Sequence, residues 1–155
     1  MSFGNGQRFS LGYMKQSLPG INAIGCLPCE ALPSHIEERA MCGIPVQVNQ
    51  YAAAVAFVGT PTCITETDYD NNGRSERTVL TFMTTEKVET RRRMAFVVRQ
   101  NNGSEYLIGH LEQPFPTVKV TQHSGSPDSD RAVYTVEVTL IGRRTLVPSD
   151  VIISD

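Results

Sequence analysis

The second half of the chain alternates apolar and polar residues with a period of two. The clearest example covers residues 134–140, where Tyr134, Val136, Val138 and Leu140 alternate with Thr135, Glu137 and Thr139. An antiparallel sheet with one face packed on a core and the other face open produces this pattern. Less regular alternation predicts further strands around residues 77–87, 93–100, 105–110 and 118–121.

Two Asn-Gly turns separate these strands. The first is Asp70-Asn71-Asn72-Gly73, and the second is Asn101-Asn102-Gly103. Asn and Gly accept the left-handed backbone that tight hairpins require, so each turn predicts a hairpin. The first hairpin has flanks rich in Thr, Glu and Arg, which suit an exposed contact surface.

A helical pattern occurs at residues 34–42. Ser34 stands three residues before Glu37, as in a capping box, and Gly43 occupies the place where a helix C-terminus favours positive φ. We therefore expect a helix of two turns. Its inward-facing residues would be Ile36, Ala40 and Met41.

The remaining pattern defines the domain organisation. Gly and Pro punctuate residues 1–33, and the Gly- and Ser-rich residues 1–17 predict a flexible N-terminal arm. We expect one domain over residues 1–155, with a β domain at 18–155. Its fold class would be mainly β: a single antiparallel β-sandwich or barrel-like domain with one short helix.

The composition bears on where the protein folds and on which partners it binds. The beginning of the chain lacks the apolar core of a secretory signal, and no apolar stretch approaches the roughly 20 residues of a spanning helix. We therefore expect folding in a cytoplasm and no membrane partner. The formal net charge is −2, which does not favour a general nucleic-acid binder.

A local basic cluster, Arg91-Arg92-Arg93, stands apart from this balance. Strand alternation would place Arg91 and Arg93 on one side and Arg92 on the other, which dilutes a phosphate-binding patch. We favour a solvated or intersubunit charge cluster over nucleic-acid contact. Together with the hairpin tip Asp70, Asn71, Asn72 and Gly73, these arginines form the predicted interaction surface.

The four cysteines raise the question of a metal or a redox site. Cys26 and Cys29 have CxxC spacing, and Cys42 with Cys63 or His35 could complete a zinc site. The pair lies in an irregular Pro-rich stretch rather than at the start of a helix, where redox pairs lie. We expect free thiols without metal, and a zinc-binding module stays as an alternative.

The segment 68–73 resembles the opening of a calcium loop. Asp68, Asp70, Asn72 and Gly73 match its first positions, but the twelfth position, which should be Glu, is Val79. Glu76 would serve only in another geometry. A polar hairpin turn explains these residues without calcium, which remains a second alternative.

Catalytic motifs give no positive signal. The histidines His35, His110 and His123 are scattered, and the chain has neither a G-x-S-x-G elbow nor a glycine-rich phosphate loop before a helix. We therefore expect a protein that is not an enzyme, with no catalytic residues and no cofactor.

A resemblance bears on the function. The stretch Glu105–Thr117 (EYLIGHLEQPFPT) reads as a strand ending in Gly, an acidic residue and a Pro pair, and an alternating strand follows at Ala132–Leu140. This layout, with Arg93–Asn102 and Leu18–Pro28 before it, resembles small bacteriophage virion proteins. The resemblance implies a β-rich, ring-forming tail or neck protein of the tail-completion or connector type.

The expected function is therefore that of a structural subunit. Its partners would be further copies of itself and neighbouring virion proteins, and it would reside in the virion after assembly in the host cytoplasm. The alternative is a small β binding module for zinc, calcium or nucleic acid.

Overall fold

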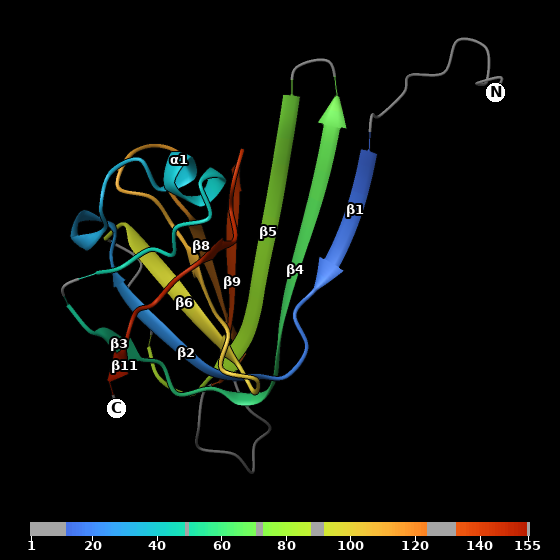
Figure 1. Ribbon diagram of the computed structural model, residues 1–155. Coiled ribbons are helices and arrows are strands. Elements are labelled where there is room, and N and C mark those ends of the chain that lie inside the picture. The colour runs from blue at the N-terminus through green and yellow to red at the C-terminus, as the bar shows by residue number, and fades with distance from the viewer. Residues whose placement is uncertain (1–11, 49, 71–72, 88–91, 124–132, 155) are drawn as a thin grey trace, which may run out of the picture.

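The computed structural model describes residues 12–48, 50–70, 73–87, 92–123 and 133–154. Two sheets face each other in a sandwich (Figure 1). The mainly β, sandwich-like fold expected from the alternation is confirmed. Among the described residues, no helix is long and apolar enough to cross a membrane.

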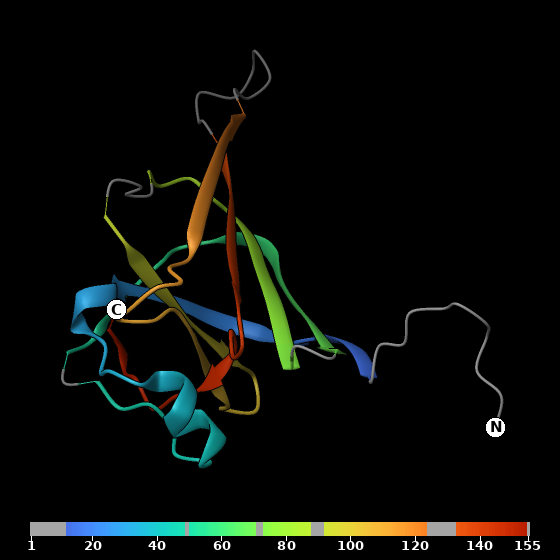
Figure 2. The same ribbon diagram turned by 90° about the horizontal axis from the view of Figure 1, so that it is seen from above.

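The first sheet has five strands, all antiparallel, in the order β1-β4-β5-β9-β8. Its strands are β1 (Gly12–Ser17), β4 (Val58–Asp70), β5 (Gly73–Thr84), β8 (Thr117–His123) and β9 (Val133–Gly142). Strands β4 and β5 form a long hairpin that, with β1, extends to one side of the body (Figure 2).

The second sheet has six strands in the order β10-β7-β6-β2-β3-β11. Its strands are β2 (Ile21–Pro28), β3 (Ala52–Ala54), β6 (Met94–Gln100), β7 (Glu105–Ile108), β10 (Val147–Pro148) and β11 (Ile153–Ser154). Among the strands that the structure describes, β11 alone runs parallel to its neighbour, β3. The short helices η1 (Cys29–Ala31) and α1 (Ile36–Met41) follow β2.

Two hydrophobic cores lie on opposite faces of the six-stranded sheet. The first fills the space between the sheets and includes Phe82, Phe96 and Val138. In the second, segments around α1 and the C-terminal residues cover the outer face of the sheet, with Ile36 and Val151 buried against it. Strand β6 contributes to both cores, since Ala95 and Val97 face one and Phe96 and Val98 the other.

Both predicted hairpins are present. Asp70 pairs with Gly73 at the end of the β4–β5 hairpin, and Gly73 has φ of 103°. At the β6–β7 turn, the Gln100 N–H donates to the Ser104 carbonyl at 2.9 Å, and Gly103 has φ of 89°. Each of the two Asn-Gly pairs therefore correctly predicted a hairpin.

The predicted helix is confirmed in position but not in its start. It begins at Ile36, and its N-cap is His35, whose side chain makes no capping bond. Ser34 is therefore one residue too early to cap it, and the predicted capping box is wrong. At the other end, the Ile44 N–H donates to the Arg39 carbonyl at 3.1 Å around Gly43, whose φ is 73°, as in a Schellman motif.

One further expectation needs correction. Residues 12–17 of the predicted flexible arm form strand β1, paired with β4; residues 1–11 lie outside the described residues. In the C-terminal segment 147–154, Val147 and Val151 are each only 1% exposed. Most of that segment therefore belongs to the second core.

Candidate functional site

The two predicted contact regions lie far apart. In Figures 1 and 2 the β4–β5 hairpin ends beside β1, whereas β6, which follows the arginine cluster, begins near η1 on the other side of the body. Asn71, Asn72 and Arg91 are outside the described residues. The structure therefore does not join the hairpin and the arginines into one surface.

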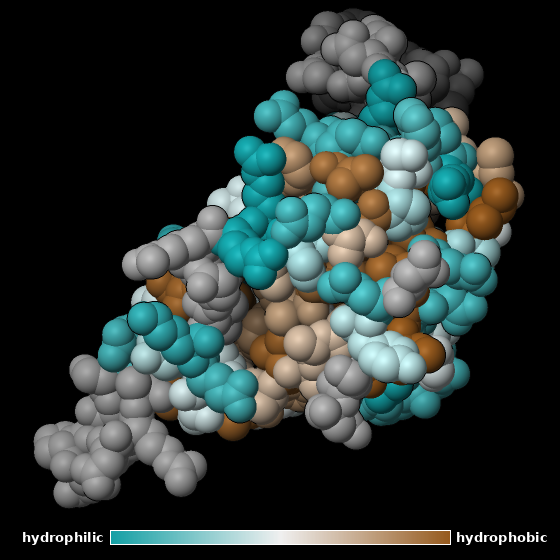
Figure 3. Space-filling model, turned by 90° about the vertical axis from the view of Figure 1, so that its left-hand side faces the viewer, coloured by the Kyte–Doolittle hydropathy of each residue, from teal (hydrophilic) through white to brown (hydrophobic). Residues whose placement is uncertain are grey.

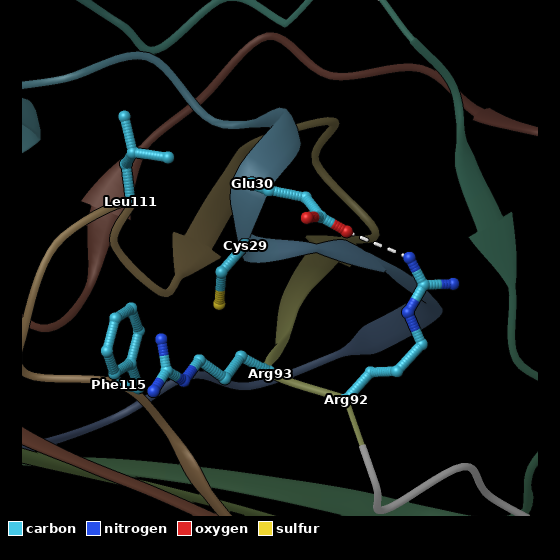
Figure 4. Close-up of a pocket in the computed structure, with 6 residues that line it drawn as sticks. All are labelled: Cys29, Glu30, Arg92, Arg93, Leu111 and Phe115. Atoms are coloured by element: carbon cyan, nitrogen blue, oxygen red, sulfur yellow. Dashed lines mark hydrogen bonds and ion pairs between the residues drawn. The ribbon is translucent and has the colours of Figure 1, made fainter.

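Arg92 and Arg93 border a cavity of about 260 Å³. Figure 4 shows their side chains diverging: Arg92 reaches Glu30, and Arg93 lies against the ring of Phe115. The Arg92 Nη2 to Glu30 Oε1 distance is 2.8 Å, and the Arg93 guanidinium carbon lies 4.3 Å from the centre of the Phe115 ring. Such stacking is a cation–π contact that also orients the guanidinium. We call this cavity the Arg93 pocket; its other lining residues are Cys29 and Leu111.

The backbone ties the two sides of the Arg93 pocket together. The Cys29 N–H donates to the Arg93 carbonyl at 2.9 Å, which fixes η1 against the start of β6. Burial raises the pKa of the Cys29 thiol, although a hydrogen bond from the His110 backbone and the charge of Arg93 oppose this. A thiol of raised pKa is a poor nucleophile at neutral pH, so Cys29 serves the pocket as an apolar wall.

His110 holds the opposite wall in place. Its Nδ1 lies 3.1 Å from the Pro114 carbonyl and its Nε2 lies 3.0 Å from the Arg144 carbonyl. Carbonyl oxygens accept hydrogen bonds but cannot donate them. An imidazole with a hydrogen on one ring nitrogen therefore donates to one of these two carbonyls, and an imidazolium donates to both. The ring is 3% exposed and anchors the loop that carries Leu111 and Phe115.

Gly109 brings this loop close to β6. A Cβ at Gly109 would lie 2.5 Å from the Ala95 Cβ, and its φ is 152°. Only glycine accommodates both the conformation and the close approach. The sequence analysis noted Gly109 only as the end of a strand in the resembling stretch and did not predict its contact with β6. Phe115, which the sequence did not single out, carried only the weak signal of an aromatic residue between two prolines.

The cysteines do not gather into a metal site. Cys26 packs on the first core and Cys63 is buried in it, while Cys29 belongs to the second core and Cys42 is exposed beyond α1. None of the four forms a disulfide. Within the described ranges, no group of three or more His, Cys, Asp or Glu side chains could hold a metal ion.

The calcium alternative meets a geometric obstacle. Thr67 is opposite Glu76 in the β4–β5 register and Asp68 is opposite Ser75, so Asp68 and Glu76 point to opposite faces of the sheet. Glu76 is buried and receives Arg74 at 2.8 Å. Glu76 therefore cannot join Asp68 around one cation.

The strands at the four sheet edges differ in length. In the six-stranded sheet, β10 and β11 have two residues each. In the five-stranded sheet, β1 has six residues and β8 has seven, and within the described residues no strand pairs with their free sides. From Tyr13 to Ser17, β1 is exposed on both faces.

The free side of β1 offers defined backbone groups. The Leu18 N–H donates to the Cys63 carbonyl at 3.0 Å, directly after the Ser17–Ile64 pair. Bonded and non-bonded pairs alternate in an antiparallel ladder. The peptide groups of Tyr13, Lys15 and Ser17 therefore point away from β4, toward the open edge.

An apolar patch lies on another side of the molecule, near β3 and β11. Figure 3 shows a band of tan and brown surface between hydrophilic margins on this side. Tyr51, Val58 and Ile152 are 64%, 45% and 63% exposed, and Ala53, Ala54 and Ala56 between them are also exposed. Monomeric proteins seldom leave such clusters open without use.

Comparison with protein-family models, curated proteins and solved structures finds no match for this chain. The candidate sites are therefore the Arg93 pocket, the edges of the five-stranded sheet and the apolar patch. Each is defined by this chain's own geometry.

Proposed function

We propose that this protein is a structural subunit that works by protein–protein contact, pairing with further copies of itself through the edges of its five-stranded sheet. The observation that carries this proposal is the contrast between edges in one molecule. The six-stranded sheet ends in two-residue strands, one of which contains Pro148, which has no N–H to donate. Within the part of the chain that the structure describes, the five-stranded sheet instead ends in two longer strands whose outer sides are unpaired.

Edge pairing between β1 of one copy and β8 of the next would extend the sheet from subunit to subunit. The two edges are different surfaces, so the contact is heterologous and generates a ring or a longer array. Main-chain hydrogen bonds supply affinity in such strand addition. The apolar patch offers a further surface for a neighbour.

The resemblance of residues 105–117 to small bacteriophage virion proteins supplies the setting of the proposal. In that setting the chain is a tail or neck component of the tail-completion or connector type, assembled in the host cytoplasm with neighbouring virion proteins. Tail-tube, portal or tape-measure genes beside its own gene would support this assignment. Genes of an unrelated pathway there would argue against it.

A proline at Lys15 tests the edge contact directly. Its N–H points to the open edge, so Lys15→Pro removes an edge donor without breaking a β1–β4 bond. Steric exclusion of the incoming strand adds to that loss. We expect self-association, measured by sedimentation at several protein concentrations, to weaken at least about tenfold, or about 1.4 kcal/mol.

Lys15→Ala is the matched control, because it removes the same charge and keeps the N–H. Lysines on edges discourage unspecific pairing, so this variant should associate as well as the parent protein or better. Far-UV circular dichroism should show both variants folded. A parent protein that is monomeric at every concentration, or a proline variant that associates as the parent does, would contradict the proposal.

A further inference from the structure

Arg93 combines a fixed position with free hydrogen-bonding capacity. The ring of Phe115 holds its guanidinium at 4.3 Å, and no carboxylate among the described residues pairs with it. A guanidinium has five N–H donors in a planar fork that matches the oxygens of carboxylate and phosphate groups. The stacked arginine is therefore oriented in advance for an oxyanion.

The charge balance of the Arg93 pocket also favours an anion. Arg92 and Arg93 contribute two positive charges and Glu30 one negative charge, and Glu30 is engaged by Arg92 at 2.8 Å. The side of the pocket formed by Cys29, Leu111 and Phe115 is apolar, whereas Arg92 and Arg93 are exposed to water. Hydrogen bonds between a guanidinium and an anion are charge-assisted, which makes them roughly twice as strong as neutral ones.

The size of the Arg93 pocket limits what can enter. Its volume of about 260 Å³ lies just below the roughly 300–1,000 Å³ typical of pockets for drug-sized ligands. It can accept one oxyanion group with a short apolar neighbour. Because His110 anchors the loop of Phe115 through the Pro114 and Arg144 carbonyls, the wall exists before any ligand arrives.

We propose that the Arg93 pocket binds an oxyanion, a phosphate or carboxylate group, through the guanidinium fork of Arg93 while Phe115 and Leu111 contact the adjoining apolar atoms. This site goes beyond the edge contact and does not depend on it. It belongs to the outer side of the six-stranded sheet, whereas the open edges belong to the other sheet.

Titration with sodium phosphate, followed by nuclear magnetic resonance at constant ionic strength, tests the proposal. We expect saturable shifts at the amides of Cys29 and Arg93 and at the Phe115 ring protons. Sodium acetate in a parallel titration reports whether a planar carboxylate also fits. Shifts spread evenly over the protein, without saturation, would overturn the proposal.

Three variants locate the binding. Arg93→Gln should weaken phosphate binding about tenfold or more, because it removes the charged fork. Phe115→Leu keeps the apolar wall but loses the stacking, and should weaken binding about threefold. The control Arg77→Gln removes the same charge from the exposed outer face of β5 and should leave the affinity unchanged.

The outcomes separate a pocket from a general charge effect. If Arg93→Gln and Arg77→Gln weaken binding equally, or neither does, the proposal is wrong. Should Arg93→Gln fail to fold, Arg93→Lys retains the charge without the fork and should still lose about threefold or more. A short single-stranded oligonucleotide distinguishes the source: tighter binding that requires Arg93 places a polymer phosphate in the pocket, and binding indifferent to Arg93→Gln contradicts the proposal.

Discussion

At the scale of single residues, burial controls the chemistry of the thiols. Cys63 is fully buried in the first core, and burial raises the pKa of its thiol from about 9.0 to about 12. Burial also raises the pKa of Cys26 and of Cys29. The structure therefore keeps these groups protonated where the unfolded chain would ionise them.

Alkaline stability should reveal this effect. Below pH 9 both states hold the Cys63 proton; above it the unfolded state releases the proton and gains free energy. The stability contributed by the thiol is thus lost as pH rises from about 9 toward 12, at up to about 1.4 kcal/mol per pH unit. Urea unfolding at several pH values between 8 and 10.5 should show a steeper fall for the parent protein than for Cys63→Ala.

The variant also loses stability through its cavity, but that loss is the same at every pH, so the difference in slope is the readout. Cys26 and Cys29 are present in both proteins and contribute equally. Parallel curves for the two proteins would show that Cys63 does not release its proton differently in the two states.

The predicted orientation of Met41 was wrong, because the helix starts at a different residue from the one expected. Met41 was expected to face inward, but it is 68% exposed. Because α1 begins at Ile36, the inward stripe consists of Ile36 and Ala40, four residues apart, and Met41 falls about 140° from Ile36 around the axis. His35 at φ of 59° starts the helix, and no sequence signal pointed to that backbone conformation.

At the scale of elements, the alternation of apolar and polar residues predicted the strands, but it did not predict the second hydrophobic core. Val136, Val138 and Leu140 are completely buried on one face of β9, as expected. The second core could not be foreseen, because it joins Ile36, Val46 and Val151 from distant parts of the chain. Irregular segments contribute most of the residues that cover this core, and such segments show no periodic pattern of apolar residues in the sequence.

The C-terminal segment gives a direct test of this second layer. Val151 is 1% exposed and its neighbour Ile152 is 63% exposed. Val151→Ala should lower the free energy of unfolding by about 2 kcal/mol, through lost burial and the cavity that remains. Ile152→Ala should change it by less than about 0.5 kcal/mol. Equal effects in urea unfolding would show that the segment is not packed as described.

At the scale of the whole molecule, the two cores share β2 and β6. Ile24 and Leu27 of β2 face different cores, as do neighbouring residues of β6. Loss of either core therefore exposes the strands that support the other. We expect one cooperative unfolding transition.

This expectation can be checked with two probes and two variants. Far-UV circular dichroism and the fluorescence of the five tyrosines, in a chain without tryptophan, should give coincident curves. Val138→Ala in the first core and Val151→Ala in the second should each shift the whole curve. A separate early transition in either variant would show that the cores unfold independently.

Burial of β6 on both sides has one more consequence, which concerns strand register. A one-residue slip normally drives apolar residues into water, and this penalty fixes the register of a strand with one polar face. The stretch Ala95–Val98 has no polar residue to mark a side. The sizes of the side chains must therefore fix the register. Ala95 fits beneath the bare Cα of Gly109, and Phe96 reaches Phe82, with ring centres 6.4 Å apart. The order of small and large side chains along β6 is therefore the information that aligns the two cores.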